Sequence, residues 1–450
     1  MKRLFNKLIL LIFFISAISF GSVNFVYSSA QISTISKDTL EILFNQFLPK
    51  AEITKMETGK FFSRKYKVML PQKLNHSDAN SELFNQRIFV SHRGFDRPTV
   101  IVTEGYVADY AEGATYSEEL CSILNANLIF VEHRYFGQSK PKNVNWKYLT
   151  IKQASDDYHN IITIFKNIYP SKWVSTGTSK GGSTSLYFKA LYPNDVDAVV
   201  AYVAPLTNAQ EDMRPINYLM NIAGSKEERK LVEDFQLRLF KNIDKYIKLL
   251  EEFAKNNKMT FPLSTNTTME YLILEYPFSY FQWGWSANKI PNKTADIYTN
   301  FNHLIKVVPP SSFDNNAYEN FGPFYYQAYT EVGYYNYNAY IPKFKKYLKQ
   351  NNYSNFVFAP DNKNIVYNSK SIENIRELLN KNATHIIQIQ GSLDPWYQTA
   401  WIPKDSVNLP VFVNTGNSHG VRISDFNITE REKIYGYLEK WLDLKIERKK

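Results

Sequence analysis

The sequence predicts an α/β protein in which a largely parallel sheet is interrupted by an inserted, mainly helical cap. Two observations lead to this fold class. Nearly continuous apolar runs alternate with segments of helical periodicity in the first half of the chain and again near its end. Between about Thr207 and Ala383 this alternation stops, and the pattern is helical or irregular and rich in aromatic residues. Because the last strands need a sheet to join, we expect one interrupted sheet rather than two independent domains.

Six strands are expected before the interruption and two after it. They are residues 65–70, 87–94, 99–106, 128–134, 173–177 and 197–206, followed by 384–391 and 410–416. Helices with one apolar face are expected at 150–169, 182–193 and 430–444. The predicted organisation is a first core segment at 31–206, a cap at 207–383 and a second core segment at 384–450.

The first thirty residues are expected to form a signal peptide. Lys2, Arg3 and Lys7 precede the apolar run LILLIFF, and small residues ending at Ala30 follow it. A membrane anchor is the alternative, although the uninterrupted run is short against the roughly 20 residues that a span needs. We therefore expect a secreted or periplasmic protein without stable membrane association.

Composition excludes several other classes of protein. The chain has 450 residues, of which 44% are hydrophobic and 21% charged, as in a globular protein with a substantial core. Cys121 is the only cysteine, so no internal disulfide can form, and we expect it to be a buried apolar residue. The net charge of +10 is spread out without a basic and aromatic groove, so no nucleic-acid partner is expected. The histidines lack the spacing of metal ligands, and no metal or other cofactor is expected.

The stretch WVSTGTSKGG, residues 173–182, places Ser179 in the pattern Gly-x-Ser-x-Gly. It follows an expected strand and opens an expected helix, which is the context of a nucleophile elbow. Gly177 and Gly181 relieve crowding at such a sharp turn, and the amino end of the next helix favours developing negative charge. We therefore expect Ser179 to be a catalytic nucleophile rather than a residue of an ordinary glycine-rich turn.

A serine nucleophile needs a base, and the base needs a carboxylate that orients it. Behind such an elbow the chain order is Ser, then Asp or Glu, then His, on loops after late strands. Asp394 follows the expected strand 384–391, and His419 follows 410–416. Taken alone, Asp394 is also explained by a turn before proline, and His419 by an ordinary loop. Together with Ser179 they predict a triad in which His419 takes the serine proton and Asp394 holds the imidazole.

An oxyanion hole requires two backbone N–H donors. The residue after the nucleophile, Lys180, supplies one of them. The other is expected from the loop after the third strand, where Gly105 and Tyr106 are the candidates. Gly105 also suits a simple turn, and both roles are compatible.

Five stretches carry a family resemblance: VEHRYFGQSKP, GTSKGG, DVDAVVAYVAPL, GSLDPW and NSHG. Together they resemble the secreted tripeptidyl aminopeptidase family of serine peptidases. They are more distantly similar to the lysosomal prolyl carboxypeptidase and dipeptidyl peptidase group, whose elbow has GSYGG where this chain has TSKGG. The similarity covers most of the chain and implies an α/β-hydrolase core, a helical cap, and cleavage near one end of a peptide, often beside proline. The family triad falls on Ser179, Asp394 and His419.

A cap over the site admits a chain end but not a folded protein, and an exopeptidase gains from a charge opposite to that of the bound terminus. Glu211 and Asp212 follow the sixth strand, where the cap begins, and are our candidates for binding a peptide N-terminus. Glu104 and Glu331 are weaker candidates. An ordinary salt bridge is the alternative for each of them.

Two aromatic runs, residues 276–285 and 322–340, stand out within the expected cap. One interpretation is that their side chains pack inside the cap and against the core. They also suit a flat apolar wall for a proline ring, since aromatic faces supply large contact area.

The sequence thus predicts a secreted serine exopeptidase that acts on peptide substrates and releases di- or tripeptides from their N-termini, with a requirement for proline left open. The alternatives on the same fold are prolyl carboxypeptidase-like and carboxylesterase activity, because fold and triad do not fix the acyl group. The rival from another class is a non-catalytic binding protein on a hydrolase scaffold. The sequence does not determine the oligomeric state.

Overall fold

The computed structural model describes residues 39–405 and 408–448, and the expected signal peptide at 1–30 lies outside them. The chain divides into two units, Met1–Ile42 and Leu43–Lys450. In the first unit, residues 39–42 begin helix α2 (Thr39–Phe47). The second unit holds the sheet and every later helix. Among the described residues, no helix combines the length and the apolar character needed to cross a membrane.

Nine strands form one mixed sheet in the spatial order β1-β2-β3-β5-β4-β6-β7-β8-β9. The strands are β1 (Glu52–Met56), β2 (Arg64–Lys73), β3 (Leu83–His92), β4 (Thr99–Thr103), β5 (Asn127–Val131), β6 (Trp173–Thr178), β7 (Ala198–Tyr202), β8 (Ile386–Gly391) and β9 (Val411–Asn414). The strands β1, β2, β3 and β5 pair in antiparallel fashion, and the pairs from β5 through β9 are parallel. The prediction of a largely parallel sheet is confirmed for these six strands.

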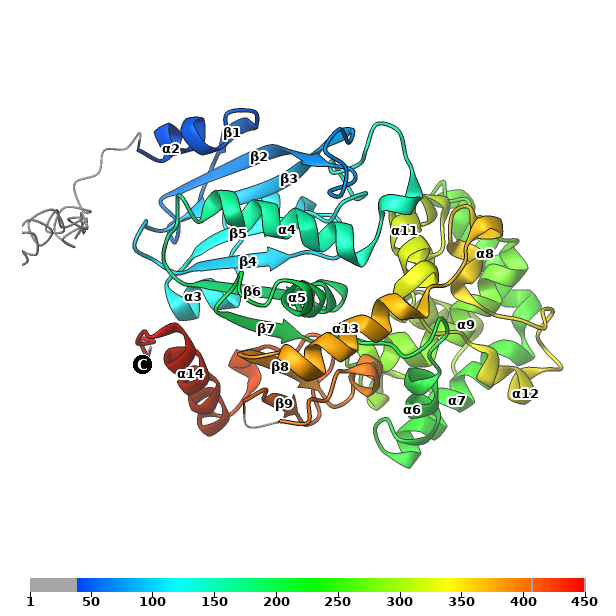
Figure 1. Cartoon of the computed structure of the whole chain (residues 1–450). Helices are drawn as coiled ribbons and strands as arrows, with labels where there is room; N and C mark the ends of the chain where they lie inside the picture. The colour runs from blue at the N-terminus through cyan, green and yellow to red at the C-terminus, as the bar shows by residue number, and fades with distance from the viewer. Residues whose placement is uncertain (1–38, 406–407, 449–450) are drawn as a thin grey trace, which may run out of the picture. The chain divides into compact units, whose positions relative to one another are not determined.

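Helices cover both faces of the sheet, which is why its central strands are buried throughout. Every residue of β4, β5, β7 and β8 is buried. Helices α4 (Ile151–Phe165), α5 (Lys180–Leu191) and α13 (Ser369–Asn382) pack together over one face (Figure 1). Helices α3 (Glu119–Leu124) and α14 (Ile428–Leu442) share a hydrophobic core with the other face. The protein therefore has the α/β-hydrolase architecture that the sequence predicts.

The edge strand β1 is the one strand that the sequence did not reveal. Its residues are exposed or half-buried, so the stretch EITKM has no apolar run. The other eight strands lie where the sequence predicts them.

Between β7 and β8 the chain forms a layer of helices with a hydrophobic core of its own. These helices are α6 (Arg214–Asn221), α7 (Lys226–Lys241), α8 (Ile243–Asn256), α9 (Thr265–Gln282), α10 (Ile297–Val307), α11 (Asn315–Gln327) and α12 (Ile341–Phe344). They lie together beyond one end of the sheet (Figure 1). Helix α9 is the centre of this cap, because all of its residues from Thr268 to Phe281 are buried. The expected cap range of 207–383 also includes α13, which packs on α5 over the sheet.

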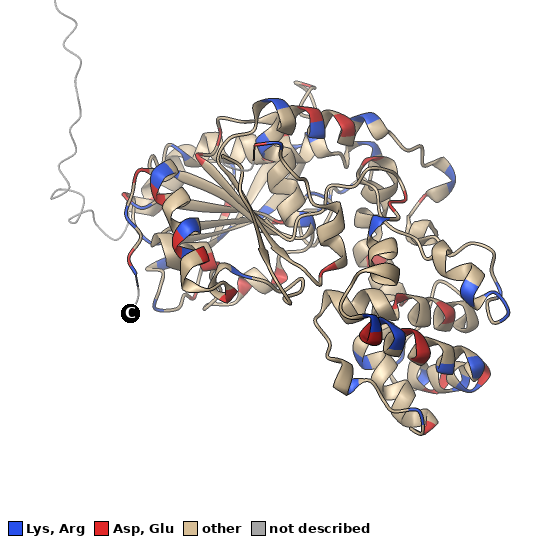
Figure 2. Cartoon of the chain, turned by 90° about the horizontal axis from the view of Figure 1, so that it is seen from below, with Lys and Arg blue, Asp and Glu red and all other residues tan. Residues whose placement is uncertain are grey.

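Charged residues are distributed along the helices without separation by sign. Figure 2 shows lysines, arginines, aspartates and glutamates interspersed on the cap helices and on the helices around the sheet, while the strands between them carry few charges. This mixture is typical of a solvated surface.

Candidate active site

Ser179 occupies a sharp turn between β6 and α5, as the elbow pattern predicts. Its backbone has φ +58° and ψ −124°, a conformation that side chains rarely adopt. The turn is fixed by a 2.9 Å hydrogen bond from the Ser179 N–H to the carbonyl of Tyr202. A methyl group on Gly177 would lie 2.4 Å from the backbone of Gly181, so this position requires glycine. The elbow is thus built by close approach of the strand to the following helix.

Asp394 and His419 come together at the same edge of the sheet. They follow β8 and β9, whose carboxyl ends meet there because the strands are parallel. Asp394 Oδ2 lies 2.6 Å from His419 Nδ1, and Asp394 is fully buried. The other carboxylate oxygen accepts a 3.1 Å hydrogen bond from the N–H of Trp396. The imidazole is therefore held through Nδ1, which leaves Nε2 to receive a proton.

Hydrogen bonds join the two loops to each other and to the cap. The N–H of Leu393 donates to the carbonyl of Asn417 at 2.9 Å. The N–H of His419 donates to the carbonyl of Gln282, the last residue of α9, at 3.0 Å. Gln282 and Ser179 line the same cavity, so this hydrogen bond ties His419 to a residue of the cavity wall. Within the described residues, no hydrogen bond joins the Ser179 hydroxyl to His419 in this conformation.

The loop after β4 packs against the first turn of α5, next to Ser179. Lys180 Nζ donates a 2.9 Å hydrogen bond to the carbonyl of Gly105, and Tyr106 lines the cavity with Ser179. Gly105 is not among the described residues that line this cavity. Of the two predicted donors on this loop, Tyr106 is therefore the better placed.

The cavity in front of Ser179 has a volume of about 130 Å³ and walls that are largely aromatic. Its aromatic lining is Tyr106, Tyr187, Phe324, Tyr334, Tyr335 and Trp396. Phe324, Tyr334 and Tyr335 come from the second aromatic run of the sequence, whereas Phe278, Tyr280 and Phe281 of the first run belong to the cap core. Tyr335 also belongs to the cap core, so the second run contributes both to the cavity wall and to packing inside the cap.

Glu275 is the only carboxylate among the described residues that line this cavity. It sits on α9 and accepts hydrogen bonds from the hydroxyls of Ser279 at 2.7 Å and of Tyr335 and Tyr337 at 2.8 Å each. Within the described part of the chain it makes no salt bridge. Burial raises the pKa of Glu275 to about 7, against the opposing effect of its three hydroxyl donors. A cation that entered the cavity would stabilise the ionised form.

Glu211 and Asp212, which the sequence suggested as ligands of a peptide N-terminus, make other contacts. Glu211 accepts hydrogen bonds from Ser354 and, at 2.5 Å, from Asn336. Asp212 forms a 2.5 Å ion pair with Arg214. Neither carboxylate is among the described residues that line the cavity. Glu211 holds cap segments together and Asp212 binds groups of its own turn, Asn208 and Arg214, so the structure does not support them as substrate ligands.

Neither of the weaker candidates, Glu104 and Glu331, is among the described residues that line the cavity. Glu104 accepts a 2.5 Å hydrogen bond from the hydroxyl of Tyr110. Glu331 belongs to a π-helical turn, Ala328–Val332, and accepts hydrogen bonds from the N–H of Ile151 and from Gln327. Burial raises the pKa of each carboxyl group to about 7. Both carboxylates face Lys180, and burial lowers the pKa of its ammonium to about 7 while the two glutamates oppose that shift.

Other candidate chemistry is absent from the described residues. Cys121 is fully buried, and burial raises the pKa of its thiol well above the usual value. No group of three histidine, cysteine, aspartate or glutamate side chains in residues 39–405 and 408–448 is arranged to hold a metal ion.

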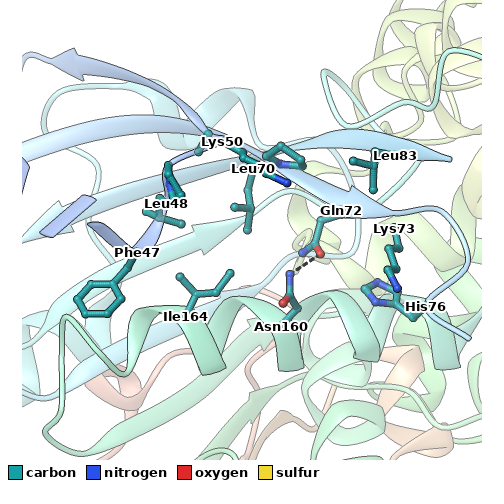
Figure 3. A pocket seen from close by; sticks show the side chains of 13 residues that line it. Phe47, Leu48, Lys50, Leu70, Gln72, Lys73, His76, Leu83, Asn160 and Ile164 are labelled. Atoms are coloured by element: carbon teal, nitrogen blue, oxygen red, sulfur yellow. Dashed lines mark hydrogen bonds between the residues drawn. The ribbon is translucent and has the colours of Figure 1, made fainter. Parts of the chain in front are cut away.

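A second hollow, of about 480 Å³, lies between β2, the segment 47–51 and helix α4 (Figure 3). Asn160 donates a 2.9 Å hydrogen bond to Gln72 there, and His76 contacts Asp157. Its thirteen described lining residues include no serine, threonine, cysteine or carboxylate. The hollow therefore lacks the groups needed for hydrolysis, and the cavity at Ser179 is the candidate active site.

The family model described as PS-10 peptidase S37 matches residues 47–442. The chain belongs to the S37 peptidase family. It is therefore a serine peptidase, and the family resemblance inferred from the motifs is confirmed.

Among the relatives of this S37 peptidase is the prolyl tri/tetrapeptidyl aminopeptidase of Streptomyces mobaraensis, which is 27% identical over 98% of this chain and 92% of the relative. The lysosomal Pro-X carboxypeptidase of Homo sapiens is 28% identical over 36% of each chain. Among solved structures, a prohormone-processing carboxypeptidase from Saccharomyces cerevisiae covers 84% of this chain and 92% of its own, with 14% identity and a TM-score of 0.41.

The sequence did not reveal Glu275. The helix that carries it reads TNTTMEYLILEYPFSYFQ, and an acidic residue in such an apolar helix signals a buried polar contact. The same helix also carries Glu270, which is bound to Tyr353 and the N–H of Lys349. Sequence alone could not tell which of the two faces the cavity.

Proposed function

We propose that this S37 peptidase is an exported exopeptidase that releases di- or tripeptides from free N-termini, with Ser179, His419 and Asp394 as its catalytic triad. The observation that carries the proposal is the contact between His419 and the buried carboxylate of Asp394, together with the hydrogen bond from the N–H of His419 to Gln282, which lines the same cavity as Ser179. A serine, an oriented imidazole and a confined cavity are what acyl transfer to a hydroxyl requires.

In the proposed reaction, Ser179 Oγ attacks the scissile carbonyl while His419 Nε2 takes its proton. The N–H groups of Lys180 and Tyr106 stabilise the negative oxygen that forms. His419 then donates the proton to the leaving amine, the C–N bond breaks, and an ester remains on Ser179. Water, deprotonated by His419, hydrolyses the ester and restores the serine.

Glu275 supports recognition of an N-terminus rather than a C-terminus. A buried carboxylate that has hydroxyl donors but no cationic partner in the described structure is costly to ionise. The α-ammonium group of a peptide would supply that partner inside the cavity. A C-terminal carboxylate would instead be repelled by it.

The aromatic walls support a preference for an apolar, flat side chain beside the scissile bond. Tyr335 stacks on Phe278 with ring centroids 4.1 Å apart, and Trp396 meets both rings edge-on. This packing holds the rings rigidly, so a proline ring would find a preformed surface. The Streptomyces relative is a prolyl enzyme by name, in agreement with this preference.

Export rests on the basic, apolar and small-residue order of the first thirty residues. Determining the first residue of the protein recovered outside the cells that make it tests this part of the proposal. A mature N-terminus near Ala30 would support it, whereas recovery of the intact chain in the membrane fraction would favour an anchor.

The central experiment is digestion of a short peptide library with free or acetylated N-termini, followed by mass spectrometry, beside a Ser179→Ala control. Release of di- or tripeptides from free N-termini only, absent in the control, is the expected result. Loss of residues from the C-terminus would replace the proposal with carboxypeptidase activity. Ester hydrolysis without peptide cleavage would contradict the peptide substrate, and no reaction with a fluorophosphonate would contradict the triad.

A further inference from the structure

The side chain of Lys180 is buried directly beneath the candidate oxyanion hole. It belongs to the first residue of α5, next to Ser179, and Lys180 is 6% exposed. Its Nζ lies 5.6 Å from the ring centres of both Tyr106 and Phe136. Burial lowers the pKa of this ammonium group to about 7. A lysine is seldom buried so completely, because removing its charge from water is costly. The contact that it makes therefore needs an explanation beyond packing.

That contact fixes one particular peptide unit. Lys180 Nζ donates to the carbonyl oxygen of Gly105 at 2.9 Å. The carbonyl of Gly105 and the N–H of Tyr106 belong to the same planar unit, and in a trans peptide they point in opposite directions. The described residues contain no cis peptide bond. When the ammonium of Lys180 holds this carbonyl, the N–H of Tyr106 must point away from Nζ of Lys180.

The units on either side of this peptide are also held. The carbonyl of Glu104 accepts a 3.1 Å hydrogen bond from the hydroxyl of Tyr158, and the carbonyl of Tyr106 accepts a 3.3 Å hydrogen bond from the N–H of His133. A methyl group on Gly105 would lie 2.7 Å from Cγ of Lys180, so the lysine stem and the loop are in direct contact. Lys180 thus holds the peptide unit between Gly105 and Tyr106. The N–H of this unit has no hydrogen-bond partner among the described residues, so it can bind a ligand.

We propose that Lys180 is a positioning residue of the oxyanion hole, because its backbone N–H is one donor and its side chain orients the peptide that presents the other donor, the N–H of Tyr106. This inference rests on the proposed role of Ser179 as the nucleophile. Through Lys180, a single residue would couple the elbow to the loop after β4. The Tyr106 N–H would then be directed before substrate arrives, which is the preorganisation that oxyanion stabilisation needs.

We expect the loss of the Lys180 side chain to weaken the binding of the transition state and not that of the substrate. If Lys180→Met frees the Gly105–Tyr106 peptide unit to rotate, kcat falls by about 10- to 1000-fold. The upper limit is the effect of losing one oxyanion donor completely. The KM stays within about threefold, because the ground-state carbonyl gains little from the hole. The affinity of a peptide aldehyde, whose adduct with a serine carries the same oxyanion, falls by the same factor as kcat.

Lys189 provides a matched control on the same helix. It is 3% exposed, and its Nζ donates to the carbonyls of Pro193 at 2.7 Å and Val196 at 2.9 Å. Burial lowers the pKa of this ammonium as well, to about 8. Lys189→Met removes a buried lysine that holds backbone carbonyls away from the cavity. It is expected to lower the stability of the fold and to leave kcat and aldehyde affinity unchanged.

The test measures kcat, KM and aldehyde affinity for the full-length wild type and the two methionine variants, with the fraction of folded sites counted by fluorophosphonate labelling. Loss of kcat and aldehyde affinity in Lys180→Met alone, at constant KM, supports the proposal. Unchanged kcat in Lys180→Met, or equal losses in both variants, overturns it. A wild type that does not label would contradict the nucleophile itself and so the proposed function.

A second pair of variants keeps the test decisive if Lys180→Met does not fold. Lys180→Arg keeps a long side chain with N–H donors, whereas the amide donor of Lys180→Gln is one bond shorter. The proposal predicts a higher kcat for the arginine variant at equal KM. Equal values of kcat in the two variants would overturn it.

Discussion

The carboxylate of Asp394 lies 2.6 Å from Nδ1 of His419 and is fully buried, so it fixes both the orientation and the tautomer of the imidazole. In Asp394→Asn the amide would favour the wrong tautomer, and we expect kcat/KM to fall by about 10⁴-fold. Asp195 and His159 form a 2.6 Å contact of the same kind away from the site. Asp195→Asn should leave kcat/KM within about twofold, as is usual for surface substitutions. Similar losses in both variants would contradict the triad.

Gly105→Ala should damage the site without unfolding the core. Its new methyl group would meet Cβ and Cγ of Lys180 at 2.8 and 2.7 Å and the backbone N of Gly181 at 2.9 Å, so the loop must move away from Ser179. We expect kcat to fall by about 100-fold or more, with the melting temperature lowered by a few degrees. Gly113→Ala is the control, since its nearest neighbour would be 3.7 Å away. Full activity of Gly105→Ala would exclude this loop from the oxyanion hole.

Glu275→Gln should weaken the selection of free N-termini. Hydrogen bonds to charged groups contribute roughly 1.5–3 kcal/mol, so KM for a peptide with a free N-terminus should rise by about 10- to 100-fold. The preference for free over acetylated peptides should fall by the same factor. Steady-state kinetics on matched pairs of peptides measures both quantities.

Glu270→Gln is the matched control for this variant. Glu270 lies on the same helix, burial raises the pKa of its carboxyl, and a tyrosine hydroxyl binds it, but it does not line the cavity among the described residues. Its substitution should leave the preference for free N-termini intact. An unchanged preference in Glu275→Gln would remove this residue from substrate binding.

Stability should depend on pH through Glu275. Burial raises the pKa of this carboxyl from 4.5 to about 7, so the folded chain keeps a proton that the unfolded chain releases. The free energy of unfolding therefore falls as the pH rises from about 5 to 7, by up to about 3 kcal/mol from this group. Urea unfolding at pH 5 and pH 8 should show a smaller fall for Glu275→Gln than for the wild type. A fall of the same size in both would show that Glu275 is ionised in the folded protein already at pH 5.

The nucleophile elbow and the fold were predictable because local sequence dictates them. Gly177 is required by the backbone of Gly181 within the elbow itself, and a methyl group on Gly181 would lie 3.0 Å from the carbonyl of Thr103 at the end of β4. The strand before Ser179 is buried over its first five residues. Asp394 and His419 were predictable for a related reason. Each follows an apolar strand directly, and parallel strands bring their carboxyl ends to one edge of the sheet.

The carboxylate that lines the cavity was not predictable in this way. Glu211 lies close in sequence to the start of the cap, yet long-range contacts with Asn336 and Ser354 turn it away from the cavity. Glu275 reaches the cavity only because α9 packs through the centre of the cap and ends beside His419. Such positions depend on how helices pack over more than a hundred residues of chain, and no local pattern encodes them.

The hydrogen bond from the N–H of His419 to the carbonyl of Gln282 couples the proposed general base to the cap. If α9 tilts to admit a peptide, either this bond breaks or the imidazole is drawn with the helix. His419 could then transfer a proton only when α9 has returned to the position that it has in this structure. An open cap, which admits the peptide, and proton transfer by His419 would then not occur at the same time. Closure of the cap would have to precede each catalytic step.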